Sequence, residues 1–297
     1  MLKQTQSSIL KTIVYFDLFH YPLTKEELWY FLHEARRSKK TIQQEVKNMH
    51  EYITQQDELI FLKKNLSYVF LRKKRMGYAT KKWHRAKRIA MMLAFIPTVR
   101  FIGVSGGLAM NNTEKNDDID LFVIAKKDTL WATRAAILLL LDVLGVRRKR
   151  ADKKVSDKIC TNMILSESVF LLPTSMQTLY GAHEVAQIVS LVNKNNTHEK
   201  FIKANLWVKK YLPNALRHRT RQNNTQNYSE AFFSVILCWV LRFSALEWLS
   251  KTLQLWIMRN YRSKEIITDT LLAFHPRDTQ QRILTMYNKN LHEYGIV

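Results

Sequence analysis

Cysteine is scarce in this chain: only Cys160 and Cys238 occur in 297 residues, and each lies within an apolar segment. Two cysteines so far apart have neither the short spacing of a metal-ligand motif nor the number that a disulfide framework needs. We therefore expect buried thiols in a reducing compartment and assign the protein to the cytoplasm.

Long hydrophobic runs are also missing. Ala135–Leu141 and Ala231–Leu241 are short, and Asp142 and Arg242 close them. Neither approaches the roughly 18 uninterrupted apolar residues that a membrane span needs. The segment Met1–Gln6 has no apolar stretch of the kind that a signal peptide carries. With 46% hydrophobic and 24% charged residues, the sequence predicts globular domains and no membrane partner.

Acidic residues are few relative to basic ones. The chain has 25 Asp and Glu against 47 Lys and Arg, a net charge of +22. The excess falls in four clusters, at residues 72–75, 81–88, 147–154 and 209–221. One such run is usually a solvated face, but four together favour a polyanionic partner, and nucleic acid is the one we expect. A generally basic proteome would give the same bias.

Glycine is scarce as well, yet three of the seven glycines fall within residues 103–107. The turn Ser105-Gly106-Gly107 follows a short apolar segment, and eleven residues later Asp118-Ile119-Asp120 leads into the apolar run Leu121–Ile124. If this run is a strand, its side chains alternate between faces, so both carboxylates project to one side, about 7 Å apart. Paired carboxylates beside a glycine turn suit Mg²⁺ and phosphate.

This arrangement resembles the nucleotidyltransferase superfamily, which has the polymerase-beta-like fold. The family signature is an apolar residue, Gly, then Gly or Ser, a spacer and Asp-x-Asp; here Gly106-Gly107 and Asp118/Asp120 match it, within roughly residues 100–170. The resemblance implies two Mg²⁺ ions held by Asp118 and Asp120, attack of an acceptor hydroxyl on the α-phosphorus of a nucleoside triphosphate, and release of pyrophosphate. Two ions about 3.5–4 Å apart neutralise both the attacking and the leaving oxygen. Backbone amides of Ser105, Gly106 and Gly107 would hold the β- and γ-phosphates.

The resemblance also implies a third carboxylate on a later strand, and the sequence has none at the matching place. The counterpart strand is Lys158–Leu165, where the polar break before Met163 points to Asn162 as the third-position residue. Asn cannot act as a base and binds Mg²⁺ less well than a carboxylate. Asp157 before the strand and Glu167 after it are alternatives. The departure leaves open a slow, atypical or inactive transferase.

Residues 1–75 predict three helices and a β-hairpin. The expected helices are 8–19, 26–34 and 41–52, and the expected strands are 58–63 and 66–72, around a turn at 64–65. Capping boxes open the second helix, at Thr24–Glu27, and the third, at Thr41–Gln44. This order resembles a winged helix-turn-helix domain, with residues 41–52 as the recognition helix and 63–65 as the wing tip. Such a domain binds nucleic acid, or serves as a packing or dimerisation module; the predicted recognition helix carries Lys47 as its one cation.

The sequence therefore predicts an α+β protein with three parts. A winged-helix-like domain, 1–75, precedes a nucleotidyltransferase core with a mixed sheet, 76–172, and a helical C-terminal domain, 173–297. The core begins with a basic helix, 77–95, expected to expose Lys82 and its neighbouring cations and to bury Trp83. Its strands are 99–104, 118–124 and 158–165, with a helix from Asp128/Thr129 to Leu144 that Gly145 ends.

The C-terminal part predicts helices at 180–192, 198–211 and 230–261, with a basic loop at 217–221 and a turn at 274–278. These helices carry apolar stripes, and the last is rich in Trp, which we interpret as core rather than cofactor contacts.

Three functions remain open from the sequence. The first is an Mg²⁺-dependent nucleotidyltransferase that uses ATP or another nucleoside triphosphate, with RNA favoured over a protein hydroxyl or a small molecule as acceptor because the chain is basic. The second is a nucleic-acid-binding regulator with a degenerate, non-catalytic transferase-like domain. The third is a toxin-type transferase that adenylylates a partner protein, and the length of the chain disfavours it.

Overall fold

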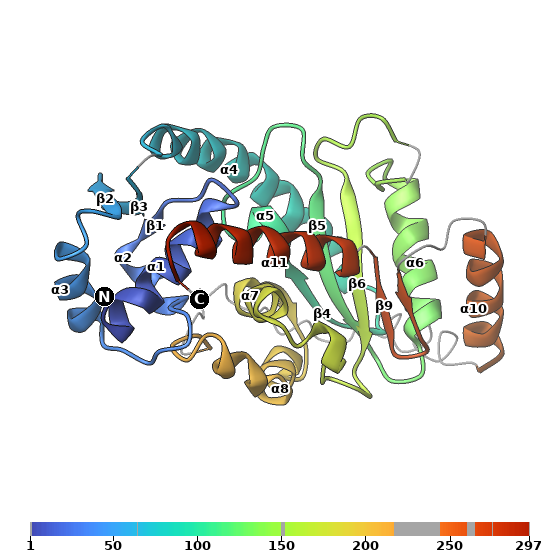
Figure 1. Cartoon of the computed structure of the whole chain (residues 1–297). Coiled ribbons are helices and arrows are strands. Elements are labelled where there is room, and N and C mark those ends of the chain that lie inside the picture. Colours follow the sequence, from blue (N-terminus) through green and yellow to red (C-terminus); the bar gives the residue numbers. More distant parts are fainter. Residues whose placement is uncertain are drawn as a thin grey trace.

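The computed structural model describes residues 2–63, 65–149, 152–216, 244–259, 265–274 and 276–296. These residues form an α+β fold with a mixed six-stranded sheet, in the order β7-β4-β5-β6-β9-β8, and a smaller sheet in the order β1-β3-β2 (Figure 1). Among the helices described, none combines the length and the apolar character that crossing a bilayer requires.

The N-terminal unit, residues 4–62, contains three helices and the small antiparallel sheet with β3 at its centre. Its elements are α1 (Gln4–Asp17), β1 (Leu23–Thr24), α2 (Lys25–Tyr30), α3 (Lys39–Lys47), β2 (Ile53–Gln56) and β3 (Leu59–Leu62). The capping box of α2 is confirmed: the Thr24 hydroxyl accepts from the Glu27 amide at 3.2 Å, and the Glu27 carboxylate accepts from the Thr24 amide at 2.8 Å. Helix α3 starts earlier than predicted because Ser38, not Thr41, caps it.

The predicted hairpin is wrong in position. Its turn lies at Asp57-Glu58, where both residues have positive φ, and residues 67–72 of the predicted second strand belong to the long helix α4 (Ser67–Ala94). The buried stripe of α4 begins Val69, Arg72, Arg75, Ala79, Lys82, which is helical spacing. Three of those five positions are cations, so the apolar pattern revealed the helix only from residue 77 and missed its first ten residues.

The central elements follow the predicted order. They are β4 (Val99–Val104), α5 (Gly106–Ala109), β5 (Ile119–Ala125), α6 (Leu130–Val143) and β6 (Ile159–Ser166). Strand β5 runs antiparallel to β4 and parallel to β6. Helix α6 ends, as predicted, before Gly145, whose φ is +66°.

The C-terminal third is mostly helical, as predicted, but it also supplies strands that the prediction lacked. Besides α7 (Leu179–Gln187), α8 (Thr197–Ala204), α10 (Ser244–Met258), α11 (Pro276–Glu293) and two 3₁₀ helices (Thr174–Met176 and Leu206–Lys210), it supplies β7 (Val189–Asn193), β8 (Ile266–Ile267) and β9 (Leu271–Ala273). Strand β7 pairs with β4, and β9 pairs with β6. The predicted helix 180–192 instead ends at Gln187, because Ile188 is extended and starts a β-branched segment. The predicted loop 217–221 and the first part of the predicted helix 230–261 lie outside the described residues.

The two faces of the large sheet are covered differently. The back face packs Ile102, Leu121 and Val123 against α4 and α6, with α10 outside α6. The site face packs Phe101, Phe122 and Ile124 against α7, α8 and α11, and this core continues into the N-terminal unit. Figure 1 shows α11 crossing from the sheet to that unit.

A buried histidine pair joins the N-terminal unit to the site face. The Nε2 atoms of His33 and His183 lie 2.9 Å apart, and His33 Nδ1 lies 3.0 Å from the Tyr287 hydroxyl of α11. Burial lowers the pKa of His33 to about 3 and that of His183 well below its usual value, so both rings are neutral. One nitrogen of the pair therefore donates and the other accepts.

Candidate active site

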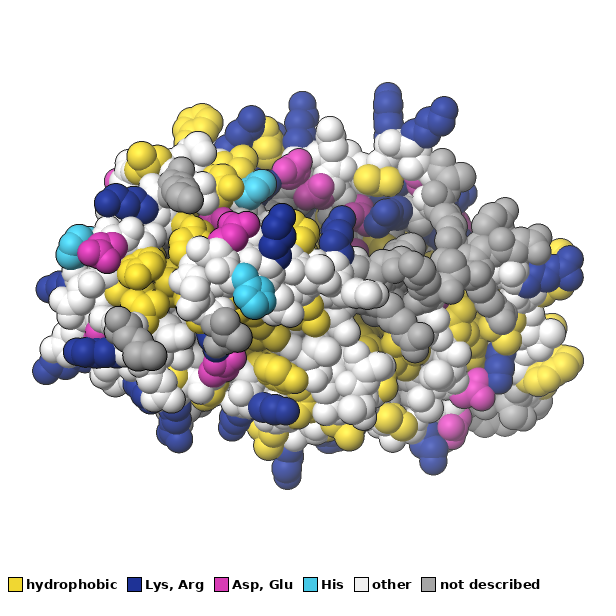
Figure 2. Space-filling model, in the orientation of Figure 1, with side chains coloured by type: hydrophobic (Ala, Val, Ile, Leu, Met, Phe, Trp, Pro, Cys, Tyr) yellow, Lys and Arg dark blue, Asp and Glu magenta, His cyan; other side chains and the backbone are white. Residues whose placement is uncertain are grey.

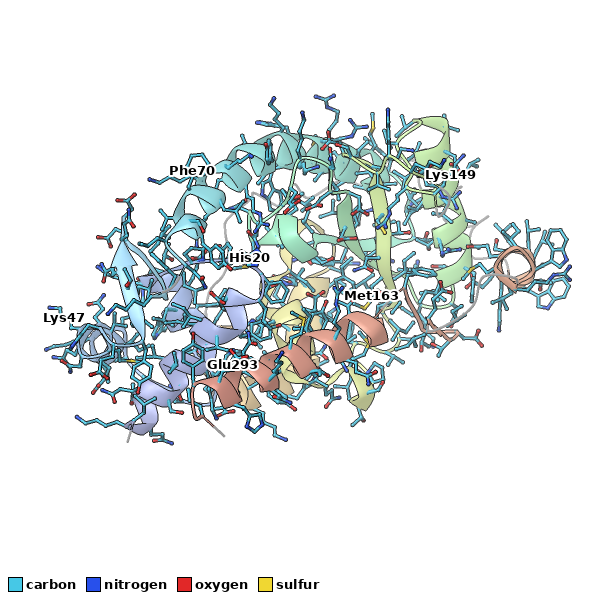
Figure 3. All side chains as sticks on the ribbon, turned by 45° about the horizontal axis from the view of Figure 1, so that its top comes forward. His20, Lys47, Phe70, Lys149, Met163 and Glu293 are labelled. Atoms are coloured by element: carbon cyan, nitrogen blue, oxygen red, sulfur yellow. The ribbon has the colours of Figure 1, made fainter. Side chains whose placement is uncertain are left out.

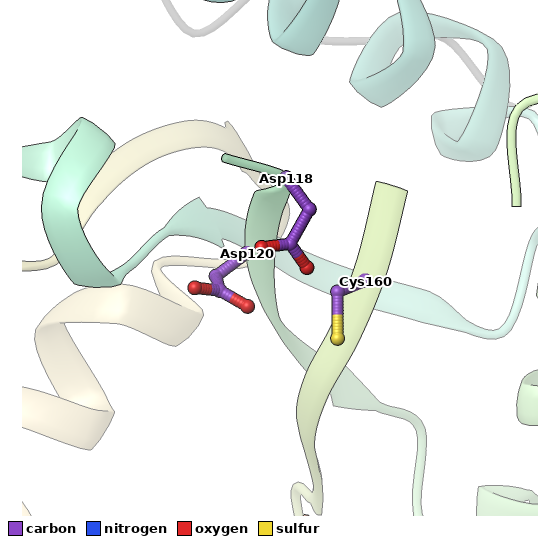
Figure 4. Close-up of side chains that lie close together, drawn as sticks. All are labelled: Asp118, Asp120 and Cys160. Carbon is purple, nitrogen blue, oxygen red and sulfur yellow. The ribbon is translucent and has the colours of Figure 1, made fainter. Parts of the chain in front are cut away.

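Two carboxylates and a thiol meet at the edge of the sheet where β5 and β6 begin (Figure 4). Asp120 lies on β5 directly opposite Cys160 on β6, and Asp118 comes just before β5. One ligand atom from each of Asp118, Asp120 and Cys160 lies within 4.8 Å of the other two. The prediction that the two carboxylates lie close together is confirmed, and Figure 4 shows the three side chains directed into a common space.

The glycine turn lies against this pair. The Ser105 amide donates to the Asp120 carbonyl at 3.1 Å, and Gly106 has a φ of +63°. A Cβ atom at Gly106 would lie 2.8 Å from Oδ2 of Asp120, so a larger residue would press on the carboxylate. The Ser105 hydroxyl is buried and has no hydrogen-bond partner in the described structure. Buried polar atoms are rarely left unpaired, so this hydroxyl marks a place where a ligand atom fits.

Arg148 is the cation closest to the carboxylates. It lies in the segment before β6, and its Nη1 donates to Asp118 Oδ2 at 2.5 Å. Its positive charge also lowers the pKa of the Cys160 thiol, which burial raises. The side chain of Asp118 is only 14% exposed, so this ion pair is partly shielded from water.

The electrostatics of the site disfavour further negative charge. Burial, then the neighbouring Asp118 and Glu184, raise the pKa of Asp120 to about 7, although Arg148 lowers it. Burial and the two aspartates raise the pKa of the Cys160 thiol strongly. A divalent cation among these groups would favour their ionised forms.

A third carboxylate, Glu184 of α7, was missed from the sequence. Burial raises its pKa to about 7, although the neighbouring Tyr180 lowers it. It lines a cavity of about 250 Å³ together with Ser105, Gly106, Asp120, Arg148 and Asn162. The available signal was that Glu184 is the one acidic residue of the mainly apolar segment Leu179–Gln187.

Asn162 also lines the cavity, but Cys160 is the β6 residue beside the carboxylates. The register explains this: Leu121 pairs with Thr161 and Phe122 with Met163, so Asn162 is an extra residue in a bulge. Cys160, read from the sequence as a buried thiol, is instead half-buried and belongs to the cluster.

The other two alternatives for the third carboxylate have different surroundings. Asp157 accepts from Lys82 Nζ at 2.7 Å. Glu167 follows the far end of β6, where it accepts from the Lys127 amide and lies 3.5 Å from Arg100. The structure brings neither of them into the cluster.

Lys82 was predicted to be exposed, but it is only 2% exposed. Its ammonium group donates to the carbonyl oxygens of Lys115, at 3.3 Å, and Asp117, at 2.6 Å, as well as to Asp157. Helix α4, which carries Lys82, thereby holds the loop that contains Asp118 in place. This contact explains why a lysine occupies an inward position of α4.

No model of a known protein family matches the chain, and comparisons with curated proteins and with solved structures found no match either.

Proposed function

We propose that the protein is a Mg²⁺-dependent nucleotidyltransferase that transfers a nucleoside monophosphate from a triphosphate to an acceptor hydroxyl. The observation that carries the proposal is the close packing of the Asp118/Asp120 pair against the Ser105-Gly106-Gly107 turn. The element order β4, turn, α5, β5, α6, β6 supports the resemblance to the polymerase-beta-like fold.

The donor set fits Mg²⁺ and a triphosphate. Asp118 and Asp120 supply hard oxygen ligands, and bound Mg²⁺ would neutralise charge on the reacting oxygens. The unpartnered Ser105 hydroxyl and the backbone amides of Gly106 and Gly107 supply donors for phosphate oxygens. Glu184 lies in the same cavity and is a candidate to accept the proton of the acceptor hydroxyl.

RNA is the acceptor that the charge distribution supports best. Three segments that touch one another near the site expose cations: α4 with Lys81 and Arg85, the Asp118 loop with Lys115, and the segment before β6 with Lys149 and Lys153. Figure 2 shows Lys and Arg side chains projecting along the edge of the molecule formed by α4, and Figure 3 shows Lys149 close to the start of β6. A polyanion is attracted to such a rim, and the attraction weakens with salt.

The element order of the N-terminal unit, α1-β1-α2-α3-β2-β3, and its sheet order, β1-β3-β2, support its interpretation as a winged-helix domain. The earlier start of α3 adds Lys39 and Lys40 to Lys47 as cations on the proposed recognition helix. The hairpin tip, by contrast, is Asp57-Glu58 rather than the predicted basic 63–65. We propose that this unit contacts nucleic acid through α3 and not through its hairpin.

The test is label transfer. Purified protein is incubated with Mg²⁺, total RNA and each of ATP, CTP, GTP and UTP labelled at the α-phosphate, and labelled RNA and pyrophosphate are measured. Asp120→Asn should lower transfer at least about 1,000-fold, because several kcal/mol of charge stabilisation is lost. Asp269→Asn, at an acid with a 71% exposed side chain, is the matched control and should be fully active. Equal activity of wild type and Asp120→Asn would contradict the proposal.

A second candidate is a nucleic-acid-binding regulator without transferase activity. The specific observations in its favour are Cys160 where a carboxylate is expected and Arg148 paired with Asp118. A regulator would bind nucleic acid equally well as wild type and as Asp120→Asn, and neither would release pyrophosphate.

A further inference from the structure

The cluster of Asp118, Asp120 and Cys160 contains one soft donor, which Mg²⁺ does not prefer. Mg²⁺ takes oxygen ligands and keeps several waters, whereas thiolate favours Zn²⁺ and related ions. We propose that Asp118, Asp120 and Cys160 form a carboxylate–thiolate site that binds a thiophilic divalent cation of the Zn²⁺ class more tightly than Mg²⁺. The proposal concerns binding and stands whether or not the protein transfers nucleotides.

The geometry is close to that of a zinc site. Zn²⁺ binds thiolate at about 2.3 Å and carboxylate oxygen at about 2.0–2.2 Å, so tetrahedral ligand atoms lie about 3.5 Å apart. The three ligand atoms already lie within 4.8 Å of one another, so small side-chain rotations bring them into range. Three protein ligands leave a fourth position open, as in catalytic zinc sites.

A second observation points to a ligand at this place. The buried Ser105 hydroxyl lines the same cavity as Asp120 and has no protein partner in the described structure. A water or phosphate oxygen bound to the cation would give it one. The hydroxyl belongs to the turn after β4, whereas the cluster is formed at the starts of β5 and β6.

Arg148 supplies the positive charge at the site in the metal-free protein. It is hydrogen-bonded to Asp118, and its positive charge acts on both other proposed ligands, Asp120 and Cys160. Cation binding must displace this guanidinium group, so Arg148 lowers the affinity for every divalent cation. The neighbouring Lys149 has a 64% exposed side chain and contacts Asp142 instead.

Binding changes the protonation of the thiol. The S–H bond of Cys160 breaks, the metal–sulfur bond forms, and the proton leaves to solvent. No electron is transferred. Binding of Zn²⁺ should therefore release about one proton that binding of Mg²⁺ does not.

The experiment uses the full chain with Cys238→Ser, so that Cys160 is the one remaining thiol. Titration with Cd²⁺ should produce the ultraviolet charge-transfer band of a metal–thiolate bond, saturating at one ion per chain, and Zn²⁺ should remove the band by competition. Adding Cys160→Ser should abolish the band and weaken Zn²⁺ binding at least about 10-fold, the loss that even an outer-shell change produces. Binding of Mg²⁺ should change little.

Two further variants test the electrostatic part. Arg148→Gln should strengthen binding of both Zn²⁺ and Mg²⁺, whereas Lys149→Gln should change neither. In the Cys238→Ser chain, which keeps Cys160, Zn²⁺ should slow alkylation of the Cys160 thiol. Mg²⁺ at equal occupancy of the site should not slow it. This measurement applies even if Cys160→Ser fails to fold.

Three results would overturn the inference: tighter binding of Mg²⁺ than of Zn²⁺, unchanged Zn²⁺ affinity in Cys160→Ser, or alkylation that Zn²⁺ does not slow. These results are distinguishable from failure of the transferase proposal. Mg²⁺-dependent pyrophosphate release without a Zn²⁺–thiolate bond would contradict only the proposal of a carboxylate–thiolate site. A Zn²⁺–thiolate bond without nucleotide transfer would contradict only the transferase proposal.

Discussion

The two faces of the large sheet differ in chemistry although they share the same strands. On β5, Leu121 and Val123 are fully buried among aliphatic residues of the back face, while Asp120 of the site face lies beside a cavity. The back face is a core that excludes water, and the site face carries acids, aromatic rings and histidines. A single strand therefore packs the back-face core with one set of side chains and lines the candidate site with the other.

The largest expected effect on stability comes from the back face. Leu121→Ala should lower the free energy of unfolding by about 2–5 kcal/mol, because it leaves a cavity in a close-packed core. Asp120→Asn, on the next residue, should leave stability nearly unchanged, since it removes a carboxylate whose charged form burial disfavours. Urea denaturation of both variants measures the difference. Equal losses would contradict the division between the faces.

The next effect concerns the lysine that links the back face to the site. Lys82→Met should cost about 1–3 kcal/mol, because two carbonyl groups and the half-exposed Asp157 lose their partner. Lys81→Met, at the exposed neighbouring position, should change stability by about 0.5 kcal/mol or less. Thermal or urea unfolding of the pair provides the test. If Lys81→Met proved as costly as Lys82→Met, the buried contact would not be the cause.

A smaller effect distinguishes the cost of backbone strain at a glycine from steric contact with the Asp120 carboxylate. Gly106 and Gly145 have φ of +63° and +66°, so an alanine at either position costs about 1–2 kcal/mol. A Cβ at Gly145 meets nothing within 4 Å, whereas at Gly106 it meets the Asp120 carboxylate. Gly106→Ala should therefore also weaken cation binding, measured by calorimetry, and Gly145→Ala should not. Equal cation affinity in the two variants would show that the turn does not press on Asp120.

The smallest effect is a pH dependence of the metal-free protein. The pKa of Glu184 is about 7 in the folded protein against an ordinary 4.5, so the folded state binds more protons than the unfolded state between these values. Its contribution to the free energy of unfolding therefore falls as pH rises from about 4.5 to 7. Glu184→Gln should flatten this part of the stability curve, measured by urea denaturation from pH 4.5 to 7.5. A steeper fall in the variant would be inconsistent with the proposed burial.

The sequence predicted the centre of the fold well and its periphery less well. Strand 99–104 and the order strand, glycine turn, strand, helix, strand are confirmed, because alternation, glycine turns and helix ends agree there; the short helix α5 after the turn was not predicted. Helix α4 was read too short because Arg72, Arg75 and Lys82 fill inward positions through ion pairs, which an apolar pattern does not record. Strand β7 was missed because its pairing with β4 is a tertiary contact.

The site was predicted only where its residues are close in sequence. Asp118, Asp120 and the turn at Ser105–Gly107 could be read from one segment. Cys160 and Glu184 reach them through a strand register and a helix placement that no local pattern specifies. A bulge at Asn162 moved the register by one residue, which is enough to exchange the side chains on a strand face.

The histidine pair has a mechanical consequence. His183 and Glu184 are consecutive residues of α7: the first meets His33 of the N-terminal unit, and the second lines the cavity. A displacement of the N-terminal unit would therefore move the same helical turn that carries the third acid. The residue that anchors this unit and the residue that lines the cavity are joined by a single peptide bond.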